Sequence, residues 1–162
     1  MNLNMDEKIQ IRNLCNWALS FNRIDSIGDV LIPANSTMRV ARGEVFTQVQ
    51  SGNNLFTGTD GLGSHARIYI DDRDTRVELD FENEDGKRTQ NVISDDKIKE
   101  IFAIKTKTAF EKAVKESIVT QAEKAVISNA VKKFKFNEYD RIKFIEEYTG
   151  IKSEVEVVES ED

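Results

Sequence analysis

The fold prediction starts from the stretch GDVLIPANSTMRV, residues 28–40. Residues 30–32 are apolar and favour a strand, residues 33–36 are turn formers, and residues 38–40 resume an extended pattern. We therefore expect a β-hairpin over residues 29–40. The stretch opens a longer region, Gly28 to Phe81, which holds the only proline, the only histidine and most of the glycines of the chain.

Two further segments of this region, Ala66–Ile70 and Val77–Phe81, alternate apolar and polar side chains as strands do. Residues 44–50 fit two patterns, because the valines at 45 and 49 share a helical face but also alternate as in a strand. We expect a short helix there, ended by Gly52. Three to five short strands predict a small antiparallel sheet or a partly open barrel.

Residues 6–21 precede this region and have the spacing of an amphipathic helix. Acidic residues at positions 6 and 7 would suit the dipole of its first turn. Trp17, the only tryptophan, is expected in a core or docking contact rather than as a stacking platform. The predicted inner face of this helix consists of Ile9, Ile11, Leu14, Cys15, Ala18 and Leu19.

From Ser94 onward the sequence is helical and rich in lysine. Ser94 can cap a helix with an acidic first turn, and the apolar stripe of that helix continues through Phe110 to Ile118. Thr120 and Glu123 have the spacing of a capping box, which predicts the start of another helix.

A last helix is expected over residues 137–149, with Gly150 as its end. Residues 154–162 alternate acids with valines. This pattern predicts either a mobile acidic tail or an edge strand that forms only on a partner.

Strands followed by helices predict an α+β fold. We expect an N-terminal helix, a small antiparallel sheet or partly open barrel, and a C-terminal helical hairpin or three-helix segment. The predicted domains are residues 1–93, a helix plus a small β domain; residues 94–152, a helical region that packs on it or on a partner; and residues 153–162, an acidic tail.

Composition excludes several classes of protein. A formal net charge of −6 over 162 residues disfavours a binder of duplex DNA. Cys15 is the only cysteine, which excludes an internal disulfide and a cysteine-based zinc site. No apolar run approaches the roughly 20 residues of a membrane span, and the first residues do not resemble a secretory signal. We expect no membrane partner.

The glycine-rich loop at residues 58–65 is the nearest approach to a ligand site. Its amides could cradle a phosphate and His65 could exchange protons. However, no Walker lysine follows it, so a plain loop is expected. The acidic run at 71–74 lacks the glycine of a calcium loop and is expected to be a solvated turn. No nucleophile and base pair is visible, so we expect no catalytic residue, cofactor or metal.

Lysines recur throughout the helical region, interleaved with glutamates. Such lysines usually decorate an exposed helix face, and binding of single-stranded nucleic acid is the alternative. The residues predicted to contact partners are Trp17, Asp60, His65, Arg67 and Tyr148.

Three runs, IPANSTMRV (32–40), QVQSGN (48–53) and GSHARIYI (63–70), resemble small uncharacterised proteins encoded by bacteriophages and prophages of AT-rich hosts. The abundance of Lys, Asn and Ile agrees with that source. The resemblance implies a virion-associated or accessory protein that works by protein contacts, located in the virion or the bacterial host cytoplasm. It brings no active site.

The function expected from these observations is that of a non-enzymatic structural or accessory protein that binds protein subunits, either its own copies or other virion proteins. One alternative is a binder of single-stranded nucleic acid that uses the sheet and the lysine-rich helices. Another is a phage inhibitor of a host enzyme whose acidic surface mimics nucleic acid. An enzyme acting through the loop at 58–65 ranks last.

Overall fold

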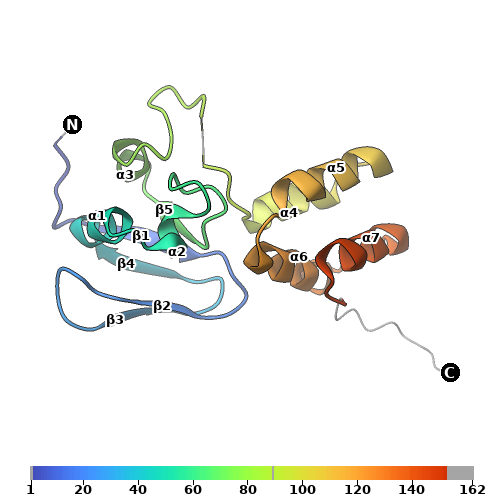
Figure 1. Ribbon diagram of the computed structural model, residues 1–162, viewed down its shortest axis with the longest axis horizontal. Coiled ribbons are helices and arrows are strands. Elements are labelled where there is room, and N and C mark those ends of the chain that lie inside the picture. Colours follow the sequence, from blue (N-terminus) through green and yellow to red (C-terminus); the bar gives the residue numbers. More distant parts are fainter. Residues whose placement is uncertain (1, 89, 153–162) are drawn as a thin grey trace. The chain divides into compact units, whose positions relative to one another are not determined.

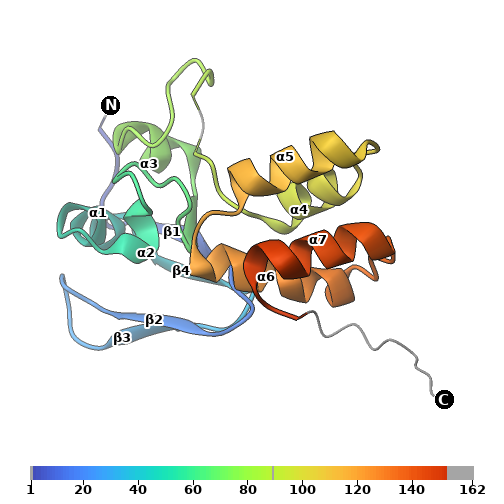
Figure 2. The same ribbon diagram turned by 45° about the vertical axis from the view of Figure 1, so that its right-hand side comes forward.

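The computed structural model describes residues 2–88 and 90–152. The chain divides into two compact units, Met1–Val92 and Ile93–Asp162, each of which is described by itself (Figures 1 and 2). The first unit contains strands and short helices, whereas the described part of the second contains helices. The fold class is α+β, as the sequence predicts.

Three antiparallel strands form the main sheet of the first unit. In β1 (Lys8–Asn13) the side chains of Ile9 and Ile11 are buried, and Ile11 lies opposite Met38 and Ile70 of the two neighbouring strands. The period of two therefore places isoleucines of adjacent strands together in the core. In spatial order the strands are β4 (Thr37–Ala41), β1 (Lys8–Asn13) and β5 (Ile68–Asp71).

A separate two-stranded antiparallel hairpin consists of β2 (Leu19–Asn22) and β3 (Asp29–Ile32). Its Phe21 packs edge-on against Phe56, with ring centroids 5.2 Å apart. The five strands thus form sheets of three and two, and the described residues do not close into a barrel.

The helix predicted over residues 6–21 is wrong, because this segment forms β1, a turn and β2. Five of the six residues expected on its inner face are buried, all but Ala18, but they lie on strands and the turn. The turn depends on the fully buried Asn13. Its Nδ2 donates to the carbonyl oxygens of Trp17 and Ile32, and its Oδ1 accepts from the N–H of Cys15.

The hairpin predicted over residues 29–40 is also wrong in its pairing. Both strands exist and the turn lies where expected, with Ser36 donating to the carbonyl of Pro33 at 3.1 Å. However, β3 pairs with β2, whereas β4 pairs with β1. The sequence does not predict β1 and β2 as strands, and these two strands pair with β4 and β3 in place of the expected pairing of β3 with β4.

Three helices complete the first unit: α1 (Arg42–Gln50), α2 (Asn54–Thr57) and α3 (Arg73–Glu78). The short helix predicted at 44–50 and the strand predicted at 66–70 are confirmed as α1 and β5. The strand predicted over Val77–Phe81 is wrong. Asp72 caps α3 by accepting from the N–H of Thr75 at 3.1 Å, and Asp80 then adopts a left-handed φ of 64°, which ends any extended run.

Four helices form the described part of the second unit, rather than a hairpin or three helices. The cap at Ser94, the capping box of Thr120 and Glu123, and the end at Gly150 are confirmed. The stripe expected to continue through Phe110 is interrupted, because Thr106 caps a new helix by accepting from Ala109 at 3.3 Å. The helices are α4 (Asp95–Phe102), α5 (Lys107–Ser117), α6 (Gln121–Lys133) and α7 (Tyr139–Thr149).

The helices of this unit lie as two pairs, α4 beside α5 and α6 beside α7, in both ribbon views (Figures 1 and 2). Across residues 2–88 and 90–152, no helix has the length and apolar character that crossing a membrane requires. The acidic tail predicted for residues 153–162 lies outside the described residues. The buried core of the unit includes Ile98, Ile101, Phe110, Val114, Ile118, Ile127, Val131 and Ile145.

Candidate functional site

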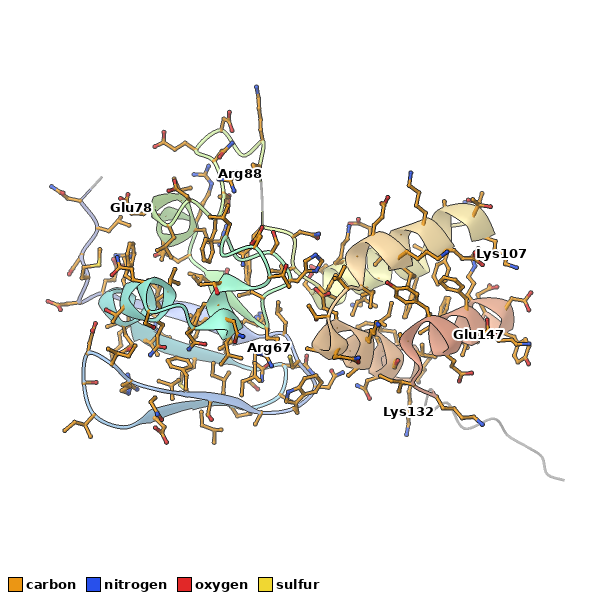
Figure 3. All side chains as sticks on the ribbon, viewed as in Figure 1. Arg67, Glu78, Arg88, Lys107, Lys132 and Glu147 are labelled. Atoms are coloured by element: carbon orange, nitrogen blue, oxygen red, sulfur yellow. The ribbon has the colours of Figure 1, made fainter. Side chains whose placement is uncertain are left out.

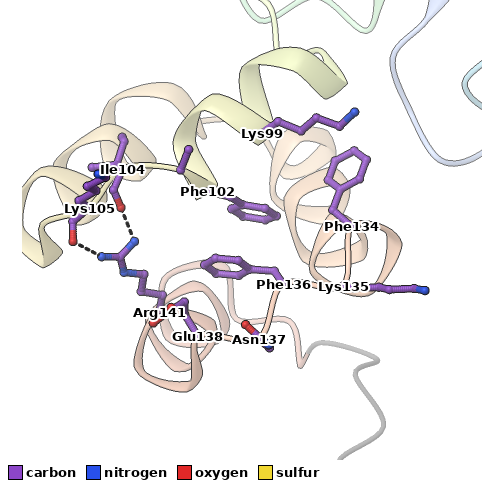
Figure 4. A pocket seen from close by; sticks show the side chains of 11 residues that line it. Lys99, Phe102, Ile104, Lys105, Phe134, Lys135, Phe136, Asn137, Glu138 and Arg141 are labelled. Carbon is purple, nitrogen blue, oxygen red and sulfur yellow. Dashed lines mark hydrogen bonds between the residues drawn. The ribbon is translucent and has the colours of Figure 1, made fainter.

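An open groove of about 700 Å³ lies in the helical unit, where α4 and α6 end and α7 begins (Figure 4). We call it the phenylalanine groove. The side chains that line it include Lys99, Phe102, Lys105, Phe134, Lys135, Phe136 and Arg141.

The end of α6 places Phe136 in this groove. Lys135 has a left-handed φ of 54°, and its N–H donates to the carbonyl of Lys132 at 3.1 Å. The N–H of Phe136 donates to the carbonyl of Val131 at 2.9 Å. These two bonds form the Schellman motif, which turns the chain back across the last turn of a helix. A lysine occupies the position that usually takes glycine.

Arg141 fixes the opposite wall. Its guanidinium donates to the carbonyl oxygens of Ile104 and Lys105, which ties the α4–α5 loop to the first turn of α7 (Figure 4). The same guanidinium lies 5.1 Å over the ring of Phe110. Through these two bonds Arg141 positions the α4–α5 loop.

Aromatic rings line the groove. Phe102 and Phe136 stack with centroids 4.2 Å apart and an interplanar angle of 7°. Phe134 meets Phe102 edge-on at 6.5 Å, and Phe110 continues from Phe136 at 6.2 Å. Phe102, Phe134 and Phe136 remain partly exposed. The groove therefore offers apolar surface to a ligand.

Lysines surround this apolar surface. Lys99 lies 5.1 Å over the Phe134 ring, and Lys133 lies 5.4 Å over it while pairing with Asp95 at 3.0 Å. Lys105 and Lys135 also line the groove and are exposed. The groove thus combines an apolar floor with exposed cations, a chemistry suited to anions that carry apolar groups.

Charge is distributed unevenly along the chain. Residues 93–152 contain thirteen Lys and Arg against ten Asp and Glu, whereas residues 1–92 contain ten against fourteen. Figure 3 shows charged side chains such as Lys107, Lys132 and Glu147 projecting from the helical unit. Glu138 is an acid among the residues that line the phenylalanine groove.

The residues predicted to contact partners do not gather in one site. Trp17 lies between β1 and β2 with 37% of its surface exposed, and Asp60, His65 and Arg67 lie in or beside the loop that precedes β5. Tyr148 belongs to the other unit, where its hydroxyl donates to the carbonyl of Ile118 at 2.7 Å. Their role in partner contacts stays a prediction.

Hydrogen bonds within the glycine-rich loop at residues 58–65 hold its shape. The Asp60 carboxylate accepts from the N–H groups of Leu62 and Ser64 at 2.8 and 3.1 Å. Burial alone would raise the pKa of Asp60, but these bonds outweigh it and hold the pKa below its usual value. A Cβ on Gly58 would come within 2.0 Å of the Ser64 carbonyl oxygen, so glycine is needed there for close backbone approach. Bonds from His65 N–H to the Asn91 carbonyl and from the Gln90 amide to the Gly63 carbonyl also tie the loop to the segment after residue 89.

A second hollow, on the first unit, is lined mainly by acids, among them Glu78, Asp80 and Glu84. Glu82, which also lines it, is buried and pairs with Arg76 at 2.6 Å. Within residues 2–88 and 90–152, no group of three or more His, Cys, Asp or Glu is placed to hold a metal ion.

Comparison with models of known protein families, with curated proteins and with solved structures finds no significant match to this chain. The candidate site therefore rests on its own geometry.

The sequence interpretation missed the groove as a unit. It assigns the lysines of this region to an exposed helix face, with binding of single-stranded nucleic acid as the alternative, and does not connect them with phenylalanines. The available signal was the run KKFKF at residues 132–136, in which aromatic and basic residues alternate just past the end of α6. Alternation of this kind does not fit a helix face, which repeats every three to four residues.

Proposed function

We propose that the protein is a non-enzymatic binding protein that acts through protein contacts, and that the phenylalanine groove docks a short acidic segment bearing aliphatic side chains. The observation that carries this proposal is the set of partly exposed phenylalanines surrounded by exposed lysines. A structural or accessory role in a bacteriophage, suggested by the sequence resemblance, stays a prediction.

Affinity at such a site would come mainly from the apolar floor. Burying one valine or leucine side chain contributes about 1.5–3 kcal/mol, whereas an exposed ion pair contributes about 0.2–1 kcal/mol. Lys99, Lys105 and Lys135 would instead select acidic segments and speed their association. Binding should therefore weaken as salt is raised, but not disappear.

Protein segments fit the groove better than nucleic-acid bases do. A base needs an accessible ring face on which to stack. Phe136 already stacks with Phe102 and Phe110, and the Phe134 ring lies beneath the ammonium groups of Lys99 and Lys133. Aliphatic side chains can pack against ring edges without displacing these contacts.

Single-stranded nucleic acid is the second candidate for the same groove. It is favoured by the excess of three basic residues between 93 and 152 and by the aromatic and basic alternation at 132–136. Binding through phosphates alone would show a steep dependence on salt. The expected response to salt therefore separates the two candidates.

The test is a fluorescence-anisotropy titration of the full chain against two labelled probes. In this chain all acids of residues 153–162 are changed to amides, so that they cannot compete with an acidic probe. The probes are a ten-residue peptide of glutamate and valine and a single-stranded oligonucleotide of fifteen thymidines. The groove variant is Lys99→Glu with Lys135→Glu. The matched control is Lys112→Glu with Lys143→Glu, which makes the same charge change at exposed positions outside the groove lining.

We expect the peptide to bind, the groove variant to bind it at least tenfold more weakly, and the control to match the parent. Peptide binding that is equally weakened in both variants would contradict the proposal, as would no peptide binding at millimolar concentration. Tight binding of the oligonucleotide without binding of the peptide would establish the second candidate instead.

A further inference from the structure

We propose that the occupant of the phenylalanine groove is the chain's own segment Ser153–Asp162, docked on the same molecule and displaced by an external ligand. This inference rests on the proposed function, since it names what the docking groove holds when no partner is present. Three features of the chain carry it: charge, reach and tethering.

The segment has the chemistry that the groove selects. SEVEVVESED contains five carboxylate side chains and three valines, and no lysine or arginine. The groove offers the exposed Lys99, Lys105 and Lys135 around the rings of Phe134 and Phe136. Carboxylates would meet the ammonium groups, and a valine would meet the apolar floor.

The segment is long enough to return to the groove. The groove adjoins the first turn of α7, and the eleven residues of that helix span about 16 Å at 1.5 Å per residue. Ten residues in an extended conformation reach about 33 Å. Gly150, with a φ of 73°, turns the chain out of the helix direction just before the segment.

Tethering makes even weak docking extensive. A short link holds the segment at an effective concentration on the order of millimolar. With a Kd of about 0.1 mM for the untethered contact, roughly nine molecules in ten would have the groove covered. An external acidic segment would then bind about tenfold more weakly than it does to a chain whose own segment cannot dock.

The first measurement compares the glutamate–valine peptide on two full-length chains, the parent and the variant E154Q/E156Q/E159Q/E161Q/D162N. We expect the variant to bind the peptide about tenfold more tightly. Equal affinity for the two chains would overturn the inference while leaving the groove as a docking site. No binding to either chain would remove the proposed function together with it.

The second measurement locates the segment directly. A spin label on Ser160→Cys can be attached selectively, because the natural Cys15 is buried with 1% of its surface exposed. We expect broadening of the amide signals of Lys99, Phe134 and Phe136, independent of protein concentration and abolished by Lys99→Glu with Lys135→Glu. The control Lys112→Glu with Lys143→Glu should keep the broadening.

Two outcomes of this measurement would overturn the inference. One is the absence of broadening at the groove in the parent chain. The other is broadening that appears only when spin-labelled and isotope-labelled molecules are mixed and that grows with concentration, since the segment would then dock on a second copy.

Discussion

The guanidinium of Arg42 is nearly enclosed, with 4% of its side chain exposed, at the junction of β4 and α1. It donates to Thr75 Oγ1 at 3.0 Å, to Glu7 at 3.0 Å and to Asp72 at 3.2 Å, and it also reaches the carbonyl oxygen of Asn4 at 2.8 Å. One side chain thus joins the segment before β1 to the cap of α3. A buried charge is tolerated only when such partners surround it.

Arg42→Met should therefore lower the free energy of unfolding by about 3 kcal/mol, because two carboxylates lose a buried partner. Urea unfolding followed by Trp17 fluorescence measures this loss in the unit that contains both residues. Arg39→Met is the control, since Arg39 is an exposed arginine on β4, and its loss should cost less than about 0.5 kcal/mol. Equal losses in both variants would refute the role given to Arg42.

Two buried or partly buried carboxylates make the first unit sensitive to acid. Burial alone would raise the pKa of Glu44, but the backbone N–H of Ile24, the Gln48 amide and the backbone N–H of Asp25 outweigh it and lower that pKa. Burial alone would also raise the pKa of Asp72, but hydrogen bonds from Thr75 and Arg42 outweigh this effect and lower that pKa. A carboxylate whose pKa is lower in the folded state stabilises the fold only while it is ionised.

The unfolding free energy should accordingly be constant above about pH 5 and decline as the pH falls through the unfolded-state values near 4 toward the lower folded-state values. Glu44→Gln should be less stable at pH 7 and show a shallower decline between pH 5 and 3. Urea unfolding at several pH values tests this. Asp29→Asn, an exposed change on β3, should leave the decline as it is in the parent. A Glu44→Gln profile parallel to the parent would argue against the assignment.

The sequence predicts correctly the ends of helices that depend on neighbouring residues. The caps at Ser94 and Thr120 and the end at Gly150 depend on residues a few positions away, and all three are confirmed. Residues 6–21 fit the spacing of a helix, but residues 8–12 also alternate polar and apolar side chains. Pairing with β4 and β5, which places Ile11 opposite Met38 and Ile70, decides for the strand β1.

The helix α3 and the phenylalanine groove were missed for different reasons. The sequence analysis assigns Asp72 to a solvated acidic turn, although aspartate is also a common N-cap residue and caps α3 in the structure. The groove, in contrast, depends on the left-handed conformation of Lys135, and lysine gives no sign that it adopts one. The sequence therefore showed the basic and aromatic residues without the turn that assembles them.

Because of the left-handed turn after α6, glycine substitutions at two neighbouring lysines should change the unfolding free energy in opposite directions. Lys135→Gly should raise the unfolding free energy of the helical unit by about 1 kcal/mol, because glycine adopts this conformation without strain. Lys132→Gly removes the same charge and side chain from within α6, where glycine should cost about 1 kcal/mol. Thermal unfolding of both variants, followed by circular dichroism, compares them. A destabilised Lys135→Gly variant would mean that the lysine side chain matters more than its backbone conformation.

On the scale of the whole molecule, the sign of the charge differs between three segments of the chain. The first unit is acidic in balance, residues 93–152 are basic, and residues 153–162 add five acidic side chains. An overall charge of −6 therefore does not reveal the excess of three basic side chains in residues 93–152, where exposed lysines line the phenylalanine groove. Net charge disfavours duplex DNA as a partner of the chain, yet it says little about what one unit binds.

Because each unit has its own buried core, the helical unit should fold without the first unit. Ile98, Phe110, Ile127 and Ile145 are each fully buried within the helical unit, so a fragment of residues 93–162 should fold alone. A domain of this size has a modest core, and we expect an unfolding free energy of about 3 kcal/mol. Circular dichroism should show a helical spectrum and a cooperative thermal transition, and Phe110→Ala should abolish both. Exposed Thr108→Ala, in the same helix, should change neither. A fragment that is unfolded on its own would show that its core requires residues 1–92.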